Sequence, residues 1–137
     1  MFVVRVYLAP SSIHGVGCFA ADPIRKGELV WQFDARIDLR IPLTEHPNFP
    51  PAVQEFLQRL SYIELVDGIE YMVLCADQAK YVNHADEPNL LETPDGLFEY
   101  AAWDIAAGDE LTCNYYASDL QAADKLGIPK SVAQGAE

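Results

Sequence analysis

The sequence predicts a mostly β or α+β fold, built from several short strands and two modest helices. Short runs rich in β-branched and aromatic residues alternate with turn residues, and only one stretch carries a strong helical period. No internal repeat or linker divides the 137 residues. Because a typical domain uses roughly 150 residues, we expect a single domain over residues 1–127, followed by a flexible tail over 128–137.

The first half of the chain contains three expected strands. Residues 2–8 alternate between apolar and polar side chains and end at a proline-serine cluster. A short extended stretch at 18–20 precedes a turn over 22–27, and residues 28–33 are the third strand candidate.

Two segments have helical signals. In the first, a proline suited to the first helical position precedes apolar residues spaced i, i+3, i+4 and i+7: Pro51, Val53, Phe56, Leu57 and Leu60. In the second, Ser118 and Gln121 have the spacing of a capping box, and Gly127 and Pro129 end the helix.

Further strands are expected at 69–74 and 97–103. A turn-rich stretch over 86–96 separates them. Residues 110–116 form a short strand or an extended arm.

The charge is strongly acidic, with 9 Lys and Arg against 21 Asp and Glu, a net of −12. Such a chain repels phosphate backbones, so we expect no direct nucleic-acid binding and a basic partner instead. Residues 60–124 hold 14 acidic residues and a single base, Lys80, for a net of −13. This segment is either a solvated acidic surface or an electrostatic funnel for a positively charged substrate.

The sequence has no apolar run near the roughly 20 residues that cross a bilayer, and its start is too short for a signal-peptide core. We therefore expect a cytoplasmic protein that does not contact membranes. The three cysteines, Cys18, Cys75 and Cys113, are far apart and form no CxxC pair. They are expected to be reduced thiols, and no metal site is predicted.

One glycine pattern suggests dinucleotide binding. Residues 15–20 read G-x-G-x-x-A, and Asp38 follows about 20 residues later. That chemistry needs a helix that opens at the glycines, with its N-terminus facing a pyrophosphate. Because Pro23 and Gly27 leave no room for a helix of three turns, we reject a dinucleotide site and expect Gly15 and Gly17 to permit close backbone approach.

Three stretches together carry a family resemblance. The first reads Ile-His-Gly-Val-Gly-Cys-Phe-Ala over 13–20, and the second reads Tyr-Val-Asn-His over 81–84 with Pro-Asn at 88–89. The third reads Gly-Asp-Glu-Leu-Thr-Cys-Asn-Tyr over 108–115. In order and spacing they resemble the motifs of SET-domain protein lysine methyltransferases, and the resemblance spans about residues 3–117.

The resemblance implies a SET-like fold of small curved sheets, in which the C-terminal arm threads beneath an earlier loop as a pseudoknot. It implies S-adenosylmethionine as the cofactor and methyl transfer to the ε-amine of a lysine in a basic protein or peptide. Tyr115 is the implied catalytic residue, and Phe33 and Tyr116 are assigned to the substrate channel. The implied cofactor-binding residues are His14, Gly15, Gly17, Tyr81, Asn83, His84 and Tyr115.

Several positions depart from the family pattern. Ala85 and Asp86 replace the usual Ser and Cys, Asn114 replaces an Asp, and the usual Glu-Tyr pair reads Gln-Phe at 32–33. No zinc-binding cysteine cluster follows the last motif in these residues. Two alternatives therefore stay open beside the enzyme: a SET-like module with little or no activity that binds basic peptides, and transfer to a small amine. A homo-oligomer is left open as well.

Overall fold

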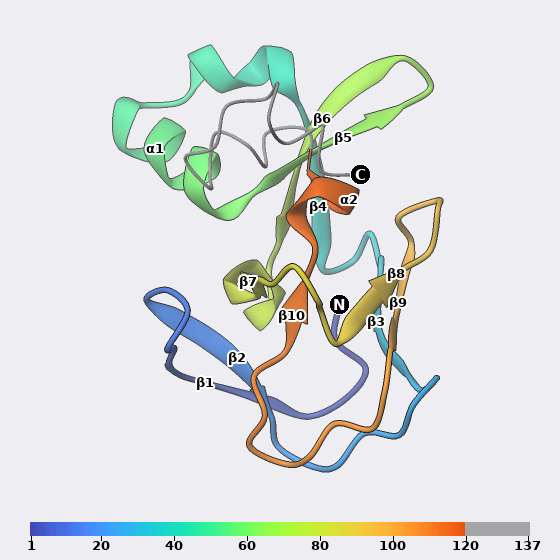
Figure 1. Ribbon diagram of the computed structural model, residues 1–137. Helices are drawn as coiled ribbons and strands as arrows, with labels where there is room; N and C mark the ends of the chain where they lie inside the picture. The colour runs from blue at the N-terminus through green and yellow to red at the C-terminus, as the bar shows by residue number, and fades with distance from the viewer. Residues whose placement is uncertain (120–137) are drawn as a thin grey trace. The chain divides into compact units, whose positions relative to one another are not determined.

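The computed structural model describes residues 1–119 (Figure 1). Contacts divide the chain into two compact units. The first unit comprises Met1–Asp38 and Cys75–Asn114, and the second comprises Leu39–Leu74 with the chain from Tyr115 onward. The described elements are mainly strands with few helices, as the pattern of expected elements predicts. The body of the last predicted helix, the boundary at 127 and the tail over 128–137 lie outside the described residues.

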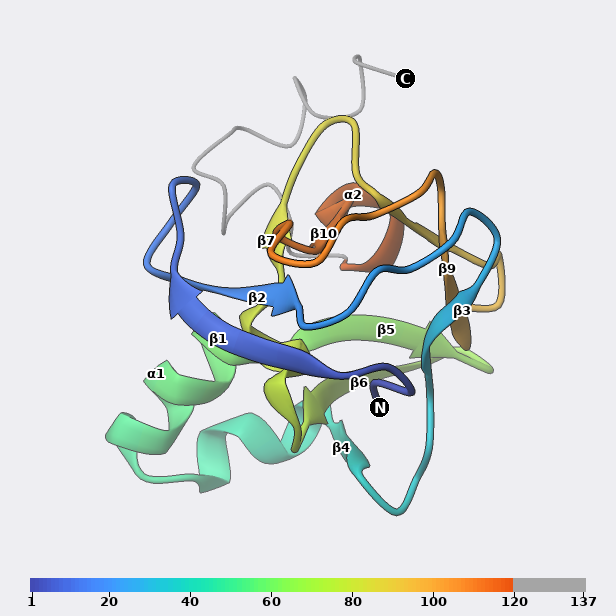
Figure 2. The same cartoon turned by 90° about the horizontal axis from the view of Figure 1, so that it is seen from below.

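The first unit begins with a hairpin of β1 (Val6–Pro10) and β2 (Val16–Ala20), antiparallel strands that lie side by side in Figure 2. The strand predicted over 2–8 therefore begins and ends later in the sequence, at Val6 and Pro10. Before β1, Phe2 forms an isolated β-bridge with Trp31. The glycine pattern lies in β2 and not at the start of a helix. The helix that dinucleotide chemistry requires therefore does not begin at these glycines.

A three-stranded antiparallel sheet follows, in the order β3 (Leu29–Gln32), β9 (Phe98–Ala101), β8 (Leu90–Glu92). The register shifts between Leu29 and Trp31, so that β3 bulges where it pairs with β9. The strands predicted at 28–33 and 97–103 are confirmed with narrower bounds. The turn-rich interpretation of 86–96 is wrong for 90–92, because these three residues pair with β9 over their whole length.

Two very short elements complete the first unit. The 3-10 helix η2 (Gln78–Tyr81) begins after Asp77, whose side chain accepts a hydrogen bond from the backbone N–H of Ala79. Strand β7 (Asn83–His84) then pairs in parallel with β10 (Thr112–Cys113). The two strands approach one another in both ribbon views (Figures 1 and 2).

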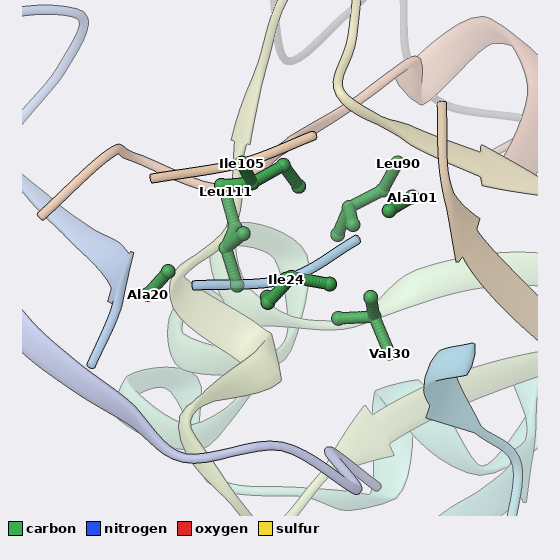
Figure 3. Packing of buried hydrophobic residues seen from close by; sticks show 7 residues of the cluster. All are labelled: Ala20, Ile24, Val30, Leu90, Ala101, Ile105 and Leu111. Atoms are coloured by element: carbon green, nitrogen blue, oxygen red, sulfur yellow. The ribbon is translucent and has the colours of Figure 1, made fainter. Parts of the chain in front are cut away.

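The core of this unit is an aliphatic cluster contributed by strands and turns from both halves of the sequence. Its members are at most 3% exposed and point towards one another in Figure 3: Ala20, Ile24, Val30, Leu90, Ala101, Ile105 and Leu111. Ile24 and Ile105 also exchange backbone hydrogen bonds of 2.8 Å. Burial of this apolar surface, at about 25 cal/mol per Å², is what holds the short strands together.

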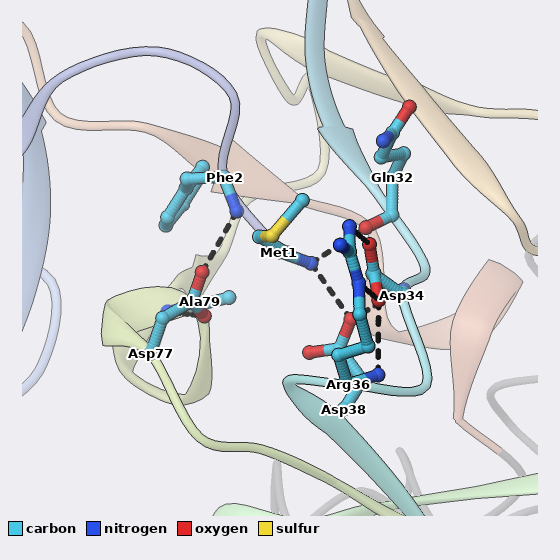
Figure 4. A network of polar contacts seen from close by, with 8 residues as sticks. All are labelled: Met1, Phe2, Gln32, Asp34, Arg36, Asp38, Asp77 and Ala79. Carbon is cyan, nitrogen blue, oxygen red and sulfur yellow. Dashed lines mark hydrogen bonds and ion pairs between the residues drawn. The ribbon is translucent and has the colours of Figure 1, made fainter.

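Polar contacts fasten the first residues to the same unit (Figure 4). The amino group of Met1 donates to Asp38 Oδ2 at 2.8 Å and to the carbonyl of Gln32 at 2.6 Å. The N–H of Phe2 donates to Asp77 Oδ2 at 2.7 Å. Asp38 is 1% exposed and its Oδ2 is bonded within the fold, so this acid is not available as the dinucleotide pattern would have required.

The second unit contains a three-stranded sheet in the order β4 (Asp38–Pro42), β6 (Ile69–Cys75), β5 (Tyr62–Val66). It also contains the 3-10 helix η1 (Leu43–Asn48) and helix α1 (Pro51–Leu60). The first predicted helix is confirmed at both ends, and 69–74 is confirmed as a strand.

The apolar stripe of α1 is only partly buried. Leu57 packs with Ile63 and Met72, whereas Val53 is 36% and Phe56 is 41% exposed.

Residues 115–118 differ from the predicted strand or extended arm over 110–116. Strand β10 ends at Cys113, and helix α2 (Tyr115–Ser118) follows after one residue. Just beyond α2, Asp119 Oδ1 accepts a hydrogen bond of 3.0 Å from the backbone N–H of Ile63 in β5. Within residues 1–119, no helix is long and apolar enough to cross a membrane.

Candidate functional site

The loop between β1 and β2 brings backbone groups to the surface. Residues 12–16 are exposed, and Gly15 has φ +49°, a left-handed conformation that glycine adopts without steric cost. A Cβ built on Gly15 would meet no heavy atom within 4 Å, so open space lies beside this residue. Gly17 is different, because its Cβ would lie 2.5 Å from Glu110 Oε2.

The side chain of Asn83 joins the second motif to this loop. Its Nδ2 donates to the carbonyls of His14 at 3.0 Å and Val16 at 3.3 Å, and to Glu110 Oε2 at 2.9 Å. Asn83 is 7% exposed, so these contacts satisfy a largely buried amide. The structure thus brings together His14, Gly15, Gly17 and Asn83 among the predicted site residues.

The third motif contacts both of the others. Leu111 N–H donates to the carbonyl of Cys18 at 2.7 Å, and Ala20 N–H donates to the backbone carbonyl of Asp109. Phe19 forms an isolated β-bridge with Glu110. Beyond this, Thr112 and Cys113 pair with β7. The C-terminal arm of the first unit therefore lies against the glycine strand and the Asn-His strand in succession.

Asn89 holds the arm in place, a role that the sequence interpretation did not assign. Its Nδ2 donates to the carbonyl of Glu110 at 2.8 Å, and its Oδ1 accepts from the N–H of Thr112 at 2.8 Å. Asn89 is 8% exposed, so both ends of its amide are satisfied in the interior. The sequence signal for this residue was its position in the Pro-Asn part of the second motif.

His84 lies on β7 beside Cys113, and its Nε2 is 3.0 Å from Asp86 Oδ1. Asp86 itself is exposed. Tyr81 ends η2, which contacts both strands of the first hairpin, and Lys80 Nζ lies 5.3 Å from the centre of its ring.

Cys18, in the centre of β2, is a buried thiol. Burial, followed by repulsion from Asp77 and Glu110, raises the pKa of its thiol to about 12. Its Sγ lies 2.9 Å from the carbonyl of Gln78 and donates to it. The protonated thiol is therefore a packing group between β2 and η2.

The remaining predicted residues fall in two places. Phe33 is half-buried at the end of β3, where its N–H donates to the carbonyl of Leu97 at 2.8 Å. Tyr115 is the half-buried first residue of α2, and Tyr116 is 38% exposed; both belong to the second unit. The substrate channel and the approach of Tyr115 to the glycine loop stay predictions. Among residues 1–119, no three His, Cys, Asp or Glu side chains gather as metal ligands.

Comparison with known proteins gives this arrangement a family. The family model described as "SET domain" matches residues 15–116, which include the glycine loop, the Asn-His strand and the C-terminal arm. A mostly β unit organised around these three segments is the class of domain that the geometry defines. The chain belongs to the SET-domain family.

Individual relatives are more distant. The Plasmodium falciparum protein named "Putative histone-lysine N-methyltransferase 1" is 24% identical in an alignment of 121 residues that covers 82% of this chain. The chain spans about 2% of the length of that relative. A crystal structure titled as a Plasmodium falciparum putative histone methyltransferase shares the fold at 22% identity, with a TM-score of 0.55 over 82% of this chain and 93% of that one.

A chain of Polycomb Repressive Complex 2 from Chaetomium thermophilum, bound to S-adenosylmethionine, is also similar. It is 25% identical, with a TM-score of 0.61 over 90% of this chain and 16% of that chain.

Proposed function

We propose that this protein is an S-adenosylmethionine-dependent protein-lysine N-methyltransferase. The observation that carries the proposal is the junction of the three SET motifs, where Asn83 Nδ2 bonds the carbonyls of His14 and Val16 beneath an exposed glycine loop. Membership of the SET-domain family and the S-adenosylmethionine-bound relative support the choice of cofactor. The acceptor is a lysine in a basic protein or peptide, which suits a chain of net charge −12.

The residues present fit this cofactor. Open space beside Gly15 and the exposed backbone of 14–16 leave room for a ligand against the loop. His14, Gly15, Asn83 and His84 would hold the cofactor, together with Tyr81 and Tyr115, while Gly17 would act through the packing of the loop. S-adenosylmethionine, when bound, supplies an electrophilic methyl group carried on a sulfonium sulfur.

The protein must present the lysine as a neutral amine, although a free lysine has a pKa of about 10.4. Enclosure between apolar walls, for which Phe33 and Tyr116 are the candidates, disfavours the ammonium form and lowers that pKa. The proton then leaves to water, so no dedicated base is required. This accounts for a site without a nucleophile–histidine pair.

Alignment is the remaining task, and good alignment is worth up to roughly 7–11 kcal/mol in intramolecular models. The hydroxyl of Tyr115 would orient the amine. Only Asn114 separates Tyr115 from β10, so covalent geometry limits the Cα separation of Cys113 and Tyr115 to about 7 Å. That short connection supports a tyrosine close to the strand pair that carries Asn83.

Two measurements test the proposal. Calorimetry should detect S-adenosylmethionine binding that Asn83→Ala removes, and labelled methyl groups should pass to lysines of basic proteins. Tyr115→Phe should strongly reduce transfer, while Tyr100→Phe, a matched control on the exposed face of β9, should not. Cofactor binding without transfer to any basic protein or small amine would favour the module that only binds peptides. Undiminished transfer by Tyr115→Phe would remove the role of that tyrosine.

A further inference from the structure

The carboxylate of Glu110 lies beneath the glycine loop and is bonded from two sides. Ser11 Oγ, at the start of the loop, donates to Oε1 at 2.7 Å and to Oε2 at 2.9 Å. Asn83 Nδ2, which also bonds two loop carbonyls, donates to Oε2 at 2.9 Å. These residues are 99 and 27 positions from Glu110 in the sequence, so a single side chain connects three distant segments.

The contacts of Glu110 set the direction of the Asn83 amide. All three groups within reach of Nδ2 are oxygen acceptors: the carbonyls of His14 and Val16, and the carboxylate of Glu110. An amide turned by 180° would place Oδ1 against these oxygens with no proton between them. The bond to a carboxylate is also stronger than one between neutral groups, so Glu110 contributes the most to this preference.

Ser11 transmits the same anchor to the backbone of the loop. Its Oγ accepts the N–H of Ile13 at 2.9 Å and that of His14 at 3.3 Å, while its own N–H donates to the carbonyl of Gly15 at 2.8 Å. A rotation of the Ser11 hydroxyl would therefore break contacts with the loop as well as with Glu110.

The absence of a side chain at Gly17 is explained by the same carboxylate. A Cβ at this position would lie 2.5 Å from Glu110 Oε2 and 2.8 Å from its Cδ, with Ser11 Cβ at 3.2 Å. Because Gly17 is buried, the lack of a side chain at this position makes room for Glu110.

We propose that Glu110 is a positioning residue of the cofactor site. It fixes the Asn83 amide and the Ser11 hydroxyl so that the loop over 12–16 is shaped before the cofactor arrives. The expected consequence, tighter cofactor binding, rests on the proposed function. The orientation of the amide, by contrast, can be measured in the protein without cofactor.

The first experiment measures S-adenosylmethionine affinity by calorimetry in Glu110→Ala, Glu110→Gln and Ser11→Ala. Loss of a charge-assisted contact to a largely buried amide should weaken binding about tenfold or more in Glu110→Ala. Glu110→Gln keeps an oxygen acceptor and should recover part of that loss. Glu28→Ala removes an exposed glutamate of the same unit and should leave affinity unchanged.

The second experiment follows the side-chain amide of Asn83 by proton–nitrogen NMR without cofactor. The resonance pair is assigned by its disappearance in Asn83→Ala. We expect it to move markedly in Glu110→Ala, less in Glu110→Gln, and not at all in Glu28→Ala. Unmoved resonances in folded Glu110→Ala would show that the carboxylate does not hold the Asn83 amide.

The third experiment uses the close approach of Gly17. In Gly17→Ala the new methyl group must displace the carboxylate, so affinity should fall as it does in Glu110→Ala. The double variant Gly17→Ala with Glu110→Ala should bind no more weakly than Glu110→Ala alone, because the methyl group then has room. Independent, multiplying losses would contradict the connection between the two residues.

The outcomes separate the two proposals. Wild-type protein that does not bind S-adenosylmethionine overturns the proposed function, and the cofactor role of Glu110 with it. Wild-type protein that binds, together with Glu110→Ala of equal affinity and an unmoved Asn83 resonance, overturns the positioning role alone. If Glu110→Ala does not fold, Ser11→Ala provides the same comparison, since it removes one of the two donors to the carboxylate.

Discussion

Replacement of Glu99 by glutamine should stabilise this protein at high pH. Glu99 lies on β9 directly opposite Glu92 of β8, so the register places two carboxyl groups on one face of the sheet. That face also carries Leu90 and Ala101 of the buried core, and both glutamates are half-buried. Burial, with repulsion from Glu92 as the second cause, raises the pKa of Glu99 from 4.5 to about 8.

The sign of the effect follows from which state holds the proton. Between pH 4.5 and about 8 the folded protein keeps a proton on Glu99 that the unfolded chain releases. Stability therefore falls as pH rises through this window, and the full destabilisation persists above it. The rise in pKa corresponds to roughly 5 kcal/mol. Relaxation and partial solvent access reduce this, so we expect an effect on the order of 2 kcal/mol at pH 9.

The assay is urea unfolding of wild type and Glu99→Gln at pH 5, 7 and 9, with Glu28→Gln as a control for removal of an exposed carboxyl. Because other titrating groups are common to both proteins, the difference between them isolates Glu99. That difference should grow by about 2 kcal/mol from pH 5 to pH 9. In a Glu92→Gln background the pH-dependent effect of Glu99→Gln should be smaller, since the two carboxyls titrate as a pair. A difference as flat as that of the control would refute a buried, repelled carboxyl at this position.

Three further outcomes are expected. Gly68→Ala should lower the free energy of unfolding in urea by about 1–2 kcal/mol, because φ at this position is +80° while the added Cβ meets nothing within 4 Å. An unchanged free energy of unfolding would contradict the left-handed conformation of Gly68. Iodoacetamide at pH 8 should modify half-buried Cys113 well before Cys18 and Cys75, because burial raises the pKa values of the latter two thiols. Equal labelling of the three cysteines in peptide mass spectra would contradict the enclosure of Cys18 and Cys75. Asn89→Ala should lower the free energy of unfolding by about 1–3 kcal/mol in the same assay, since it leaves the buried N–H of Thr112 without its acceptor. A loss below the error of the method would exclude this contact.

Local signals in the sequence predicted local structure well. Helix α1 begins at Pro51 and ends at Leu60 as expected, because a proline at the first position and a period of i, i+3, i+4, i+7 both act within one element. Strand β5 was missed although its signal was present. Asp67 and Gly68, with φ 51° and 80°, form the two-residue turn of the β5–β6 hairpin, and Asp-Gly is typical of such turns.

Contacts between distant segments could not be predicted from pattern. Strands β7 and β10 have two residues each, too few for any alternation, and their parallel pairing joins residues 83–84 to 112–113. The family motifs indicated which residues meet at the glycine loop, but not why. The assignment of Gly17 to the cofactor stays a prediction, and the structure adds that Glu110 lies in the space that a side chain at this position would need. That reason depends on a contact that only the folded chain creates.

The acidic segment over 60–124 can now be divided by what its carboxylates do. Five of them accept hydrogen bonds from backbone N–H groups within turns or between segments: Asp77, Asp95, Asp104, Asp109 and Asp119. Glu110 is bonded to Ser11 and Asn83, and Glu64 pairs with Arg40. With Asp86, which contacts His84, at least eight of the 14 acids in the segment therefore have a partner within the fold. The local excess of negative charge therefore has a structural cause that is separate from any attraction of a basic substrate: a fold made of many short elements uses carboxylates to satisfy its backbone donors.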